Sequence, residues 1–320
     1  MEEIKEHRGV RDSTISIYKR HLNKLATEIT GKDFSSTEFI KQKYGEISKF
    51  LDKQTISKKK NYLAAILAAI SPTGKKEAKK GFEKVYDKYV EELLSEHKKY
   101  TDKINTHTKN IKEDKNWIDW KDILKLQRKL GREIKSKGYK QSSTDLDSKG
   151  RDLLMRYLVL SLYTLHPPRR LEYADTKIIS EPDYKNLSSK EKENNIYLVK
   201  KSRNKKYFSF GKEAVKSETK DNVIIPVDRG LNSVLNLWLS YNDSDSLLLN
   251  SRGQKLTHNG LTKFLNKIFK HTGKKISANM LRKIKISNEF EPEEVEKKQK
   301  LAEAMNHSVG VQQSVYLKKD

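Results

Sequence analysis

Arg169 and Arg170 directly follow two prolines at the end of an apolar run, a position where their cationic side chains could be fixed to bind an anion. They follow an apolar run and two prolines in YLVLSLYTLHPPRRLEYADTKI, and Glu172 lies three residues after Arg169. Proline ends a helix because it has no N–H and its ring clashes with the preceding turn, so the chain turns just before the arginines. Two interpretations are open. The segment is an ordinary basic helix terminus, or its guanidinium groups are fixed where they grip a phosphate in bidentate fashion.

Three later residues would complete a reactive phosphate site. Arg282 lies in SANMLRKIKISN, and His307 lies in AMNHSVGVQQSVYLKKD with Tyr316 nine residues later. Tyrosine has a pKa near 10 and is a poor nucleophile at neutral pH, so a tyrosine that attacks phosphorus needs guanidinium groups on the non-bridging oxygens and a proton acceptor nearby. Each residue also has a bland interpretation: a surface arginine, a capping or buried histidine, and a C-terminal anchor.

The composition favours a polyanionic partner. The 320 residues carry a formal charge of +24, which opposes folding by self-repulsion but suits nucleic acid or an anionic membrane. The longest apolar run, YLAAILAAI, is far shorter than the roughly 20 residues that cross a bilayer, and MEEIKEHRG lacks the apolar core of a signal peptide. We therefore expect an intracellular protein without a membrane segment. The absence of cysteine excludes disulfides and thiolate metal sites.

The apolar pattern divides the chain into two parts. Residues 1–105 show only helical periodicity, for example at 13–29 and 56–72, and predict an all-helical domain. The polar stretch 106–116 is interpreted as a linker. Residues 117–320 combine helical patterns at about 119–137 and 150–165 with short β-like runs, NIYLV, KYFSF and NVIIPV, and so predict a mainly helical α+β domain. Both parts have more basic than acidic residues, as a clamp around a duplex would require. The expected DNA contacts outside the reactive site are Arg170, Lys58, Lys59 and Lys60.

The motif residues, taken in order, resemble the tyrosine recombinase, or phage integrase, family. The series is Arg169-x-x-Glu172, a lysine between two strands, Asn279-x-x-Arg282, and His307 followed nine residues later by Tyr316. The spellings HPPRR and NMLR are most similar to integrases of virophages and large DNA viruses of protists, which implies integration of a viral genome. The resemblance covers about residues 117–320 as a catalytic domain, and residues 1–105 are similar in position and pattern to the family's helical core-binding domain.

The resemblance implies a chemistry. Tyr316 attacks a DNA phosphodiester and leaves a 3′-phosphotyrosyl intermediate and a free 5′-hydroxyl, which a second strand's hydroxyl later reverses. Arg169 and Arg282 stabilise the pentacoordinate transition state, His307 assists by hydrogen bonding or proton transfer, and Glu172 orients Arg169. No cofactor or metal is implied. The implied partner is double-stranded DNA, bound by a homo-tetramer that is a monomer or weak dimer without DNA.

A lysine should protonate the leaving 5′-oxygen, and the family places it in a β-hairpin between the two arginines. YFSFGKEAVKSETKDNVIIPV offers Lys212, Lys216 and Lys220. Lys216 is the first choice because it lies between the two expected strands, where a turn would direct it into the site, and Lys220 is the alternative.

Two features depart from the family pattern. Asn279 occupies the position where the family's second motif usually has histidine, and an amide cannot take a proton near neutral pH. Base duty would then fall on His307, water or another group. Only LKKD follows Tyr316, so docking of a C-terminal helix on a neighbouring protomer is not expected.

Two other functions stay open on the sequence. One is a type IB-like DNA topoisomerase that uses the same phosphotyrosyl chemistry without ordered strand exchange. The other is a non-catalytic DNA-binding protein on a recombinase fold. The helical N-terminal domain favours the recombinase over the topoisomerase.

Overall fold

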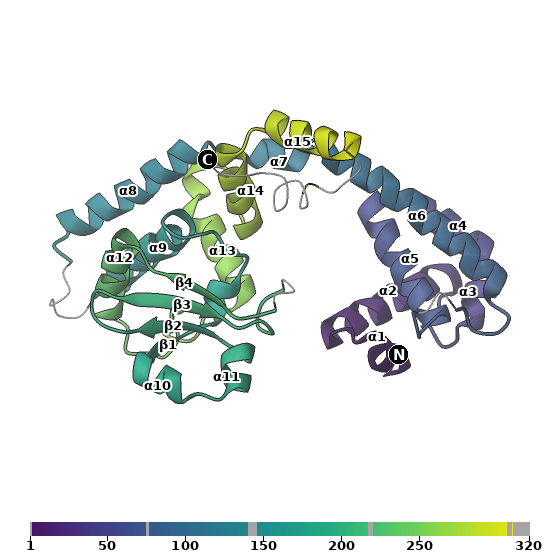
Figure 1. The fold of residues 1–320 in the computed structure, drawn as a ribbon, viewed down its shortest axis with the longest axis horizontal. Coiled ribbons are helices and arrows are strands. Elements are labelled where there is room, and N and C mark those ends of the chain that lie inside the picture. Colours follow the sequence, from purple (N-terminus) through teal and green to yellow (C-terminus); the bar gives the residue numbers. More distant parts are fainter. Residues whose placement is uncertain (1, 75–76, 140–145, 217–219, 306–308, 310–320) are drawn as a thin grey trace. The chain divides into compact units, whose positions relative to one another are not determined.

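The computed structural model describes residues 2–74, 77–139, 146–216, 220–305 and 309. The chain forms two compact units, Met1–Thr108 and Lys109–Asp320. It is mainly helical with one small four-stranded sheet, as the sequence predicts (Figure 1). None of the helices in the described ranges is both long and apolar enough to cross a membrane.

The described residues of the first unit form helices joined by turns and loops, with no strand among them. Its helices are α1 (Glu2–Arg8), α2 (Asp12–Thr30), α3 (Glu38–Gln42), α4 (Tyr44–Asp52), α5 (Ile56–Ile70) and α6 (Glu83–Asn105). From Tyr62 onward α5 is apolar nearly all round, so it is buried between α2 and α6. The core of the unit forms around its Leu63 and Ile66, with Leu25 of α2 and Tyr89 of α6.

The second unit contains the sheet. Its helices are α7 (Ile111–Asn116), α8 (Trp120–Ser136), α9 (Ser148–Thr164), η1 (Glu172–Asp175), α10 (Glu181–Asn186), α11 (Ser189–Asn194), α12 (Arg229–Leu239), α13 (His258–Ile268), η2 (Lys270–Thr272), α14 (Ala278–Glu289) and α15 (Pro292–Ala304). Its strands are β1 (Thr176–Ser180), β2 (Ile196–Lys200), β3 (Lys206–Phe210) and β4 (Val223–Pro226). Helix α9 is the most buried helix of this unit and packs against α8, α12 and α13.

The sheet has the order β1-β2-β3-β4 (Figure 1). β1 pairs with β2 in parallel, through a crossover that contains α10 and α11, whereas β2, β3 and β4 are antiparallel. The register sets Ile196 opposite Phe210 at one end of the sheet and Lys200 opposite Lys206 at the other. The three predicted β-like runs are β2, β3 and β4, while β1 and the parallel pairing were not predicted.

The stretch 106–116 is helical in its second half. Asn110 caps α7, since its side chain accepts from the backbone N–H of Glu113, whose carboxylate accepts from the N–H of Asn110 in return. The segment is fixed on the second unit, because Glu113 pairs with Lys283 and the Asn116 side chain accepts from the Lys275 N–H at 2.7 Å. The part of the expected linker from 111 onward is therefore an ordered element.

Candidate functional site

The turn after α9 is held by a buried hydrogen-bond network. Tyr173 is fully buried, and its Oη donates to the carbonyl of Pro167 at 3.0 Å. The same Oη lies 2.7 Å from Nδ1 of the buried His166. Because the Oη proton is engaged by Pro167, Nδ1 is the donor in this second bond and carries the ring proton. Burial, and next the charge of Arg169, lower the pKa of His166 to about 4, so the ring is neutral at pH 7.

Arg169 leaves this turn and stacks on the sheet. Its guanidinium carbon lies 4.2 Å from the centre of the Phe210 ring, at the end of β3. The backbone is fixed one residue later, where Tyr163 of α9 donates to the carbonyl of Arg170 at 2.6 Å. The guanidinium group of Arg169 is therefore held at the end of the sheet where β2 begins and β3 finishes.

Glu172 lies close to this cluster but does not pair with Arg169. No ion pair of Glu172 occurs within the described ranges, and its Oε2 is buried without a hydrogen-bond partner. The role of Glu172 in orienting Arg169 stays a prediction, and the contact that the structure gives to the Arg169 guanidinium is the one with the Phe210 ring.

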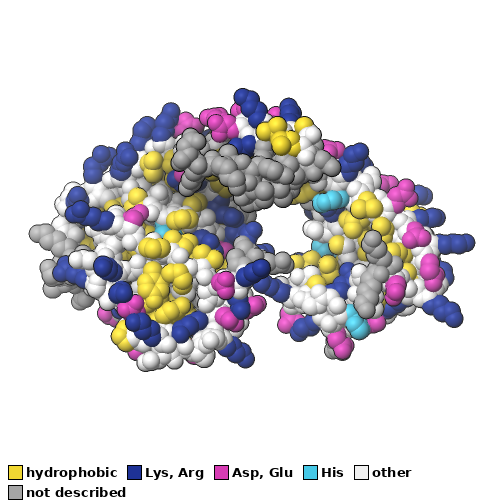
Figure 2. Space-filling view, in the orientation of Figure 1, with side chains coloured by type: hydrophobic (Ala, Val, Ile, Leu, Met, Phe, Trp, Pro, Cys, Tyr) yellow, Lys and Arg dark blue, Asp and Glu magenta, His cyan; other side chains and the backbone are white. Residues whose placement is uncertain are grey.

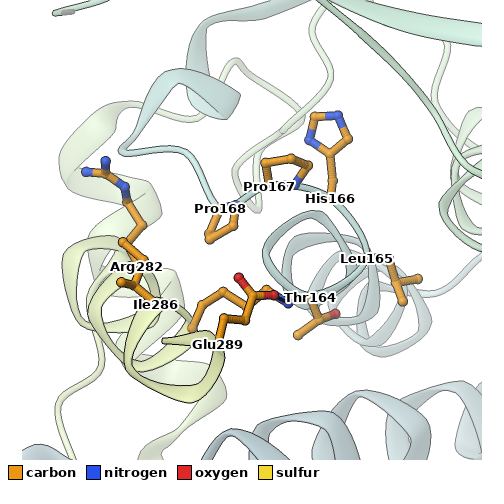
Figure 3. A pocket seen from close by; sticks show the side chains of 9 residues that line it. Thr164, Leu165, His166, Pro167, Pro168, Arg282, Ile286 and Glu289 are labelled. Atoms are coloured by element: carbon orange, nitrogen blue, oxygen red, sulfur yellow. Dashed lines mark ion pairs between the residues drawn. The ribbon is translucent and has the colours of Figure 1, made fainter. Parts of the chain in front are cut away.

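Arg282 is brought to the same turn by α14. Leu281 and Ile284 bury one face of this helix, and the neighbouring face carries Arg282. A pocket of about 430 Å³ separates Arg282 and Glu289 of α14 from the end of α9 and the turn that follows it. Figure 3 shows Arg282, Ile286 and Glu289 on one side of this pocket and Thr164, Leu165 and the two prolines on the other.

Charged residues of both motifs, Glu172 from the first and Arg282 from the second, act on the pKa of Tyr163. Burial is the main cause of a raised pKa at Tyr163; the charge of Glu172 raises it further and that of Arg282 opposes it. Burial is also the main cause of a raised pKa at Tyr173; the neighbouring Tyr163 raises it further, the charge of Arg169 lowers it, and that of Glu172 raises it. Arg169 and Arg282 are more than a hundred residues apart in the chain, yet their charges act on two neighbouring buried tyrosines, Tyr173 and Tyr163, whose ring centres lie 5.4 Å apart.

The connection between β3 and β4 begins at the Arg169 end of the sheet. Gly211 directly follows Phe210, and a Cβ there would lie 2.2 Å from the Glu193 carbonyl, so only glycine fits without a shift of the backbone. Lys212 is held by Glu193 at 2.9 Å, a bond that raises the pKa of its ammonium. Lys216 and Lys220 are exposed, on either side of residues 217–219, which lie outside the described residues.

The remaining predicted site residues are placed as follows. Asn279 is exposed on α14, one turn before Arg282. His307 and Tyr316 lie outside the described residues. Arg170 is half-buried, and its carbonyl, not its side chain, carries the contact to Tyr163.

The lysines of α5 correct one prediction. Lys59 is buried, and its ammonium lies 2.8 Å from both Asp52 and Glu92 and 3.7 Å from Glu96. These bonds raise its pKa despite the burial. Lys59 is therefore a structural ion in the first unit and not the DNA contact that was expected.

The lysines on either side of it face outward. Lys58 is exposed, and Lys60 is half-buried with its ammonium 2.8 Å from Nδ1 of His97 and 4.1 Å from the centre of the Tyr100 ring. Only these two positions of the KKK run remain open to a phosphate.

Sequence reasoning missed the roles of His166 and Tyr173. Both are polar residues in a segment of mixed character, and no local periodicity marks them as buried. The signal that was present is the position of His166 directly before the Pro-Pro step, which fixes it at the end of α9.

The surface around both units is rich in cations. Figure 2 shows Lys and Arg side chains spread over the visible faces of both units, interspersed with Asp and Glu. Among the described residues no group of three or more His, Asp or Glu side chains could hold a metal ion.

Comparison with known proteins finds little. No family model matches the sequence, and no curated protein matches it. Among solved structures, the crystal structure of XerA recombinase matches with a TM-score of 0.31 and 12% identity, over 88% of this chain and 79% of that chain. A TM-score this low does not establish a shared fold.

Proposed function

We propose that this chain is a site-specific DNA recombinase or integrase that cuts and rejoins DNA through a 3′-phosphotyrosyl intermediate. One observation supports the proposal: the charge of Arg169, from the turn after α9, acts on Tyr173, and that of Arg282, from α14, acts on Tyr163, whose buried ring lies 5.4 Å from that of Tyr173. Two guanidinium groups on one site suit the non-bridging oxygens of a phosphodiester and the charge that develops on them in the transition state.

The roles of the other residues follow from this assignment. Tyr316 attacks phosphorus, and the bond to the 5′-oxygen breaks as the phosphotyrosyl bond forms. Lys216 or Lys220 gives a proton to the leaving 5′-oxygen, and their position on the connection that starts beside Arg169 supports this role. Lys212 is the weakest choice of the three, since Glu193 holds its ammonium. His307 assists with hydrogen bonding or proton transfer, and a homo-tetramer on double-stranded DNA carries out strand exchange.

Covalent trapping on nicked duplexes tests the proposal. Wild-type protein should give a protein–DNA adduct that survives SDS, and Tyr316→Phe should give none. The adduct should also form in EDTA, because guanidinium groups supply the charge stabilisation. Duplexes carrying candidate target sites should be compared with unrelated duplexes of equal length.

Arginine variants separate catalysis from binding. Arg169→Ala or Arg282→Ala should slow adduct formation at least about a hundredfold, roughly 3 kcal/mol in the transition state, with little change in DNA affinity. Arg128→Ala is the matched control, since Arg128 is an exposed arginine of α8 in the same unit. An adduct that persists in Tyr316→Phe, or equal losses of binding and cleavage in the arginine variants, would overturn the assignment. Relaxation of any supercoiled plasmid by the wild type would instead indicate a topoisomerase.

A further inference from the structure

The turn between β2 and β3 gathers cations at the end of the sheet opposite Arg169. Residues 200–206 read KKSRNKK, and all but the last of these residues are exposed. Lys200 pairs across the strands with Lys206, whereas Phe210, on which Arg169 stacks, lies four residues further along β3. At the rise of an antiparallel strand this separates the two ends by roughly 13 to 14 Å. The turn therefore lies outside the site that Arg169 and Arg282 form.

The side chain of Lys206 is buried and links this turn to α12 through hydrogen bonds. It is 5% exposed, and its ammonium donates to the carbonyl of Arg203 at 2.7 Å, to Asn232 Oδ1 at 2.8 Å and to Asn236 Oδ1 at 2.6 Å. Both asparagines also donate to the Arg203 carbonyl, at 3.2 and 3.0 Å. All three ammonium hydrogens are satisfied by neutral acceptors, and the backbone at Arg203 is fixed.

Among the described residues, no carboxylate forms an ion pair with the ammonium of Lys206. Neither Lys206 nor Lys200 takes part in an ion pair with the described residues, whereas Lys201 lies 3.6 Å from Glu181. Burial, followed by the charges of Lys200 and Arg203, lowers the pKa of Lys206 to about 8. A buried cation among like charges is costly, and an anion placed next to it removes part of that cost.

An open pocket lies at this point. It has a volume of about 560 Å³, and its lining includes Lys200, Ser202 and Arg203 from the turn, Asn236 and Ser240 at the end of α12, and Lys206 at its base. The Ser202 hydroxyl accepts from the Lys205 N–H and keeps its own hydrogen for a ligand, whereas the Ser240 hydroxyl already donates to the Leu237 carbonyl at 2.8 Å. Together with the cationic side chains of Lys200 and Arg203, Ser202 provides the kinds of donor that bind a tetrahedral oxyanion.

We propose that this pocket binds a phosphate group of a nucleic-acid backbone, as a second contact remote from the Arg169–Arg282 site. Lys200 and Arg203 contact the phosphate directly, and Lys206 supplies charge from behind while it holds the turn. The identity of the ligand as nucleic acid rests on the proposed function, but the anion site itself does not. Because the pocket is remote from the reacting centre, it contributes to binding and not to the cleavage step.

The salt dependence of DNA binding tests the proposal. Each phosphate contact contributes about 0.9 to the slope of log K against log salt concentration, so Lys200→Gln with Arg203→Gln, which removes the contact to one phosphate, should reduce the slope for random duplex DNA by about 0.9. The matched control is Lys129→Gln with Lys135→Gln, which removes two exposed cations of α8 in the same unit. Adduct formation at saturating protein should be unchanged in the turn variant. Equal slopes in the turn and control variants would overturn the proposal, whereas failure of the wild type to form any adduct would overturn only the cleavage chemistry.

Nuclear magnetic resonance of protein labelled with nitrogen-15 lysine gives a second measurement. The Lys206 signal, assigned by its loss in Lys206→Arg, should titrate near pH 8 in chloride and at higher pH in inorganic phosphate of equal ionic strength. The shift should disappear in the Lys200→Gln, Arg203→Gln variant. A Lys206 titration that is the same in both salts would overturn the anion site. A shift with phosphate but none with duplex DNA would overturn its assignment to nucleic acid.

Discussion

Replacement of Tyr173 by phenylalanine should loosen the turn that carries Arg169. The change keeps the buried ring but removes the Oη that accepts from His166 and donates to the Pro167 carbonyl. Each lost bond leaves a buried polar group unpaired, at a cost of about 1 to 2 kcal/mol. We expect Tyr173→Phe to lower the free energy of unfolding by about 2 to 4 kcal/mol.

Urea unfolding followed by tryptophan fluorescence measures the free energy of unfolding of the second unit, which contains Tyr173. The three tryptophans, Trp117, Trp120 and Trp238, all belong to the second unit. Tyr197→Phe is the control, because this ring is also buried but its Oη makes only a 3.5 Å contact, to the Glu191 carbonyl. The control should lose less than about 1 kcal/mol. If Tyr173→Phe is no less stable than the control, the network does not hold the turn, and the account of how Arg169 is positioned would have to be abandoned.

Two further changes test the packing of each unit. Lys59→Met should destabilise the first unit by about 2 to 4 kcal/mol, because it leaves the mostly buried Glu92 without its cation, whereas Lys58→Met should change stability by less than about 0.5 kcal/mol. Helical circular dichroism during urea unfolding measures both, and equal stability of the two variants would show that Lys59 is not a buried ion. Gly211→Ala should cost about 1 to 3 kcal/mol in the tryptophan-reported transition, since its Cβ would meet backbone carbonyls, while Gly45→Ala has open space around the Cβ and should be neutral or slightly stabilising. A silent Gly211→Ala would mean that the start of the β3–β4 connection is not packed as described.

Local patterns in the sequence were enough to predict most elements. Helices α2 and α5 and strands β2, β3 and β4 each lie where the periodicity of apolar residues indicated, because side chains repeat every 3.6 or 2 residues in those elements. Strand β1 was missed. It pairs in parallel with β2, which requires the intervening crossover, and nothing within its five residues specifies that partner.

The sequence by itself determined the residue types, their order and the surplus of positive charge. It predicted Arg169 and Arg282 as a catalytic pair, which stays a prediction, and in the structure their charges act on the neighbouring buried rings of Tyr173 and Tyr163. Only the tertiary structure decided which lysines are surface charges and which are buried, since Lys58 and Lys59 are neighbours in the chain and differ only in the helix face they occupy. The tertiary structure also placed the lysine-rich β3–β4 connection at the end of the sheet beside Arg169, and the basic β2–β3 turn around Lys206 at the opposite end. Burial and strand register are set by contacts between residues far apart in the chain, and those contacts give each cation its neighbours, its pKa and its access to a ligand.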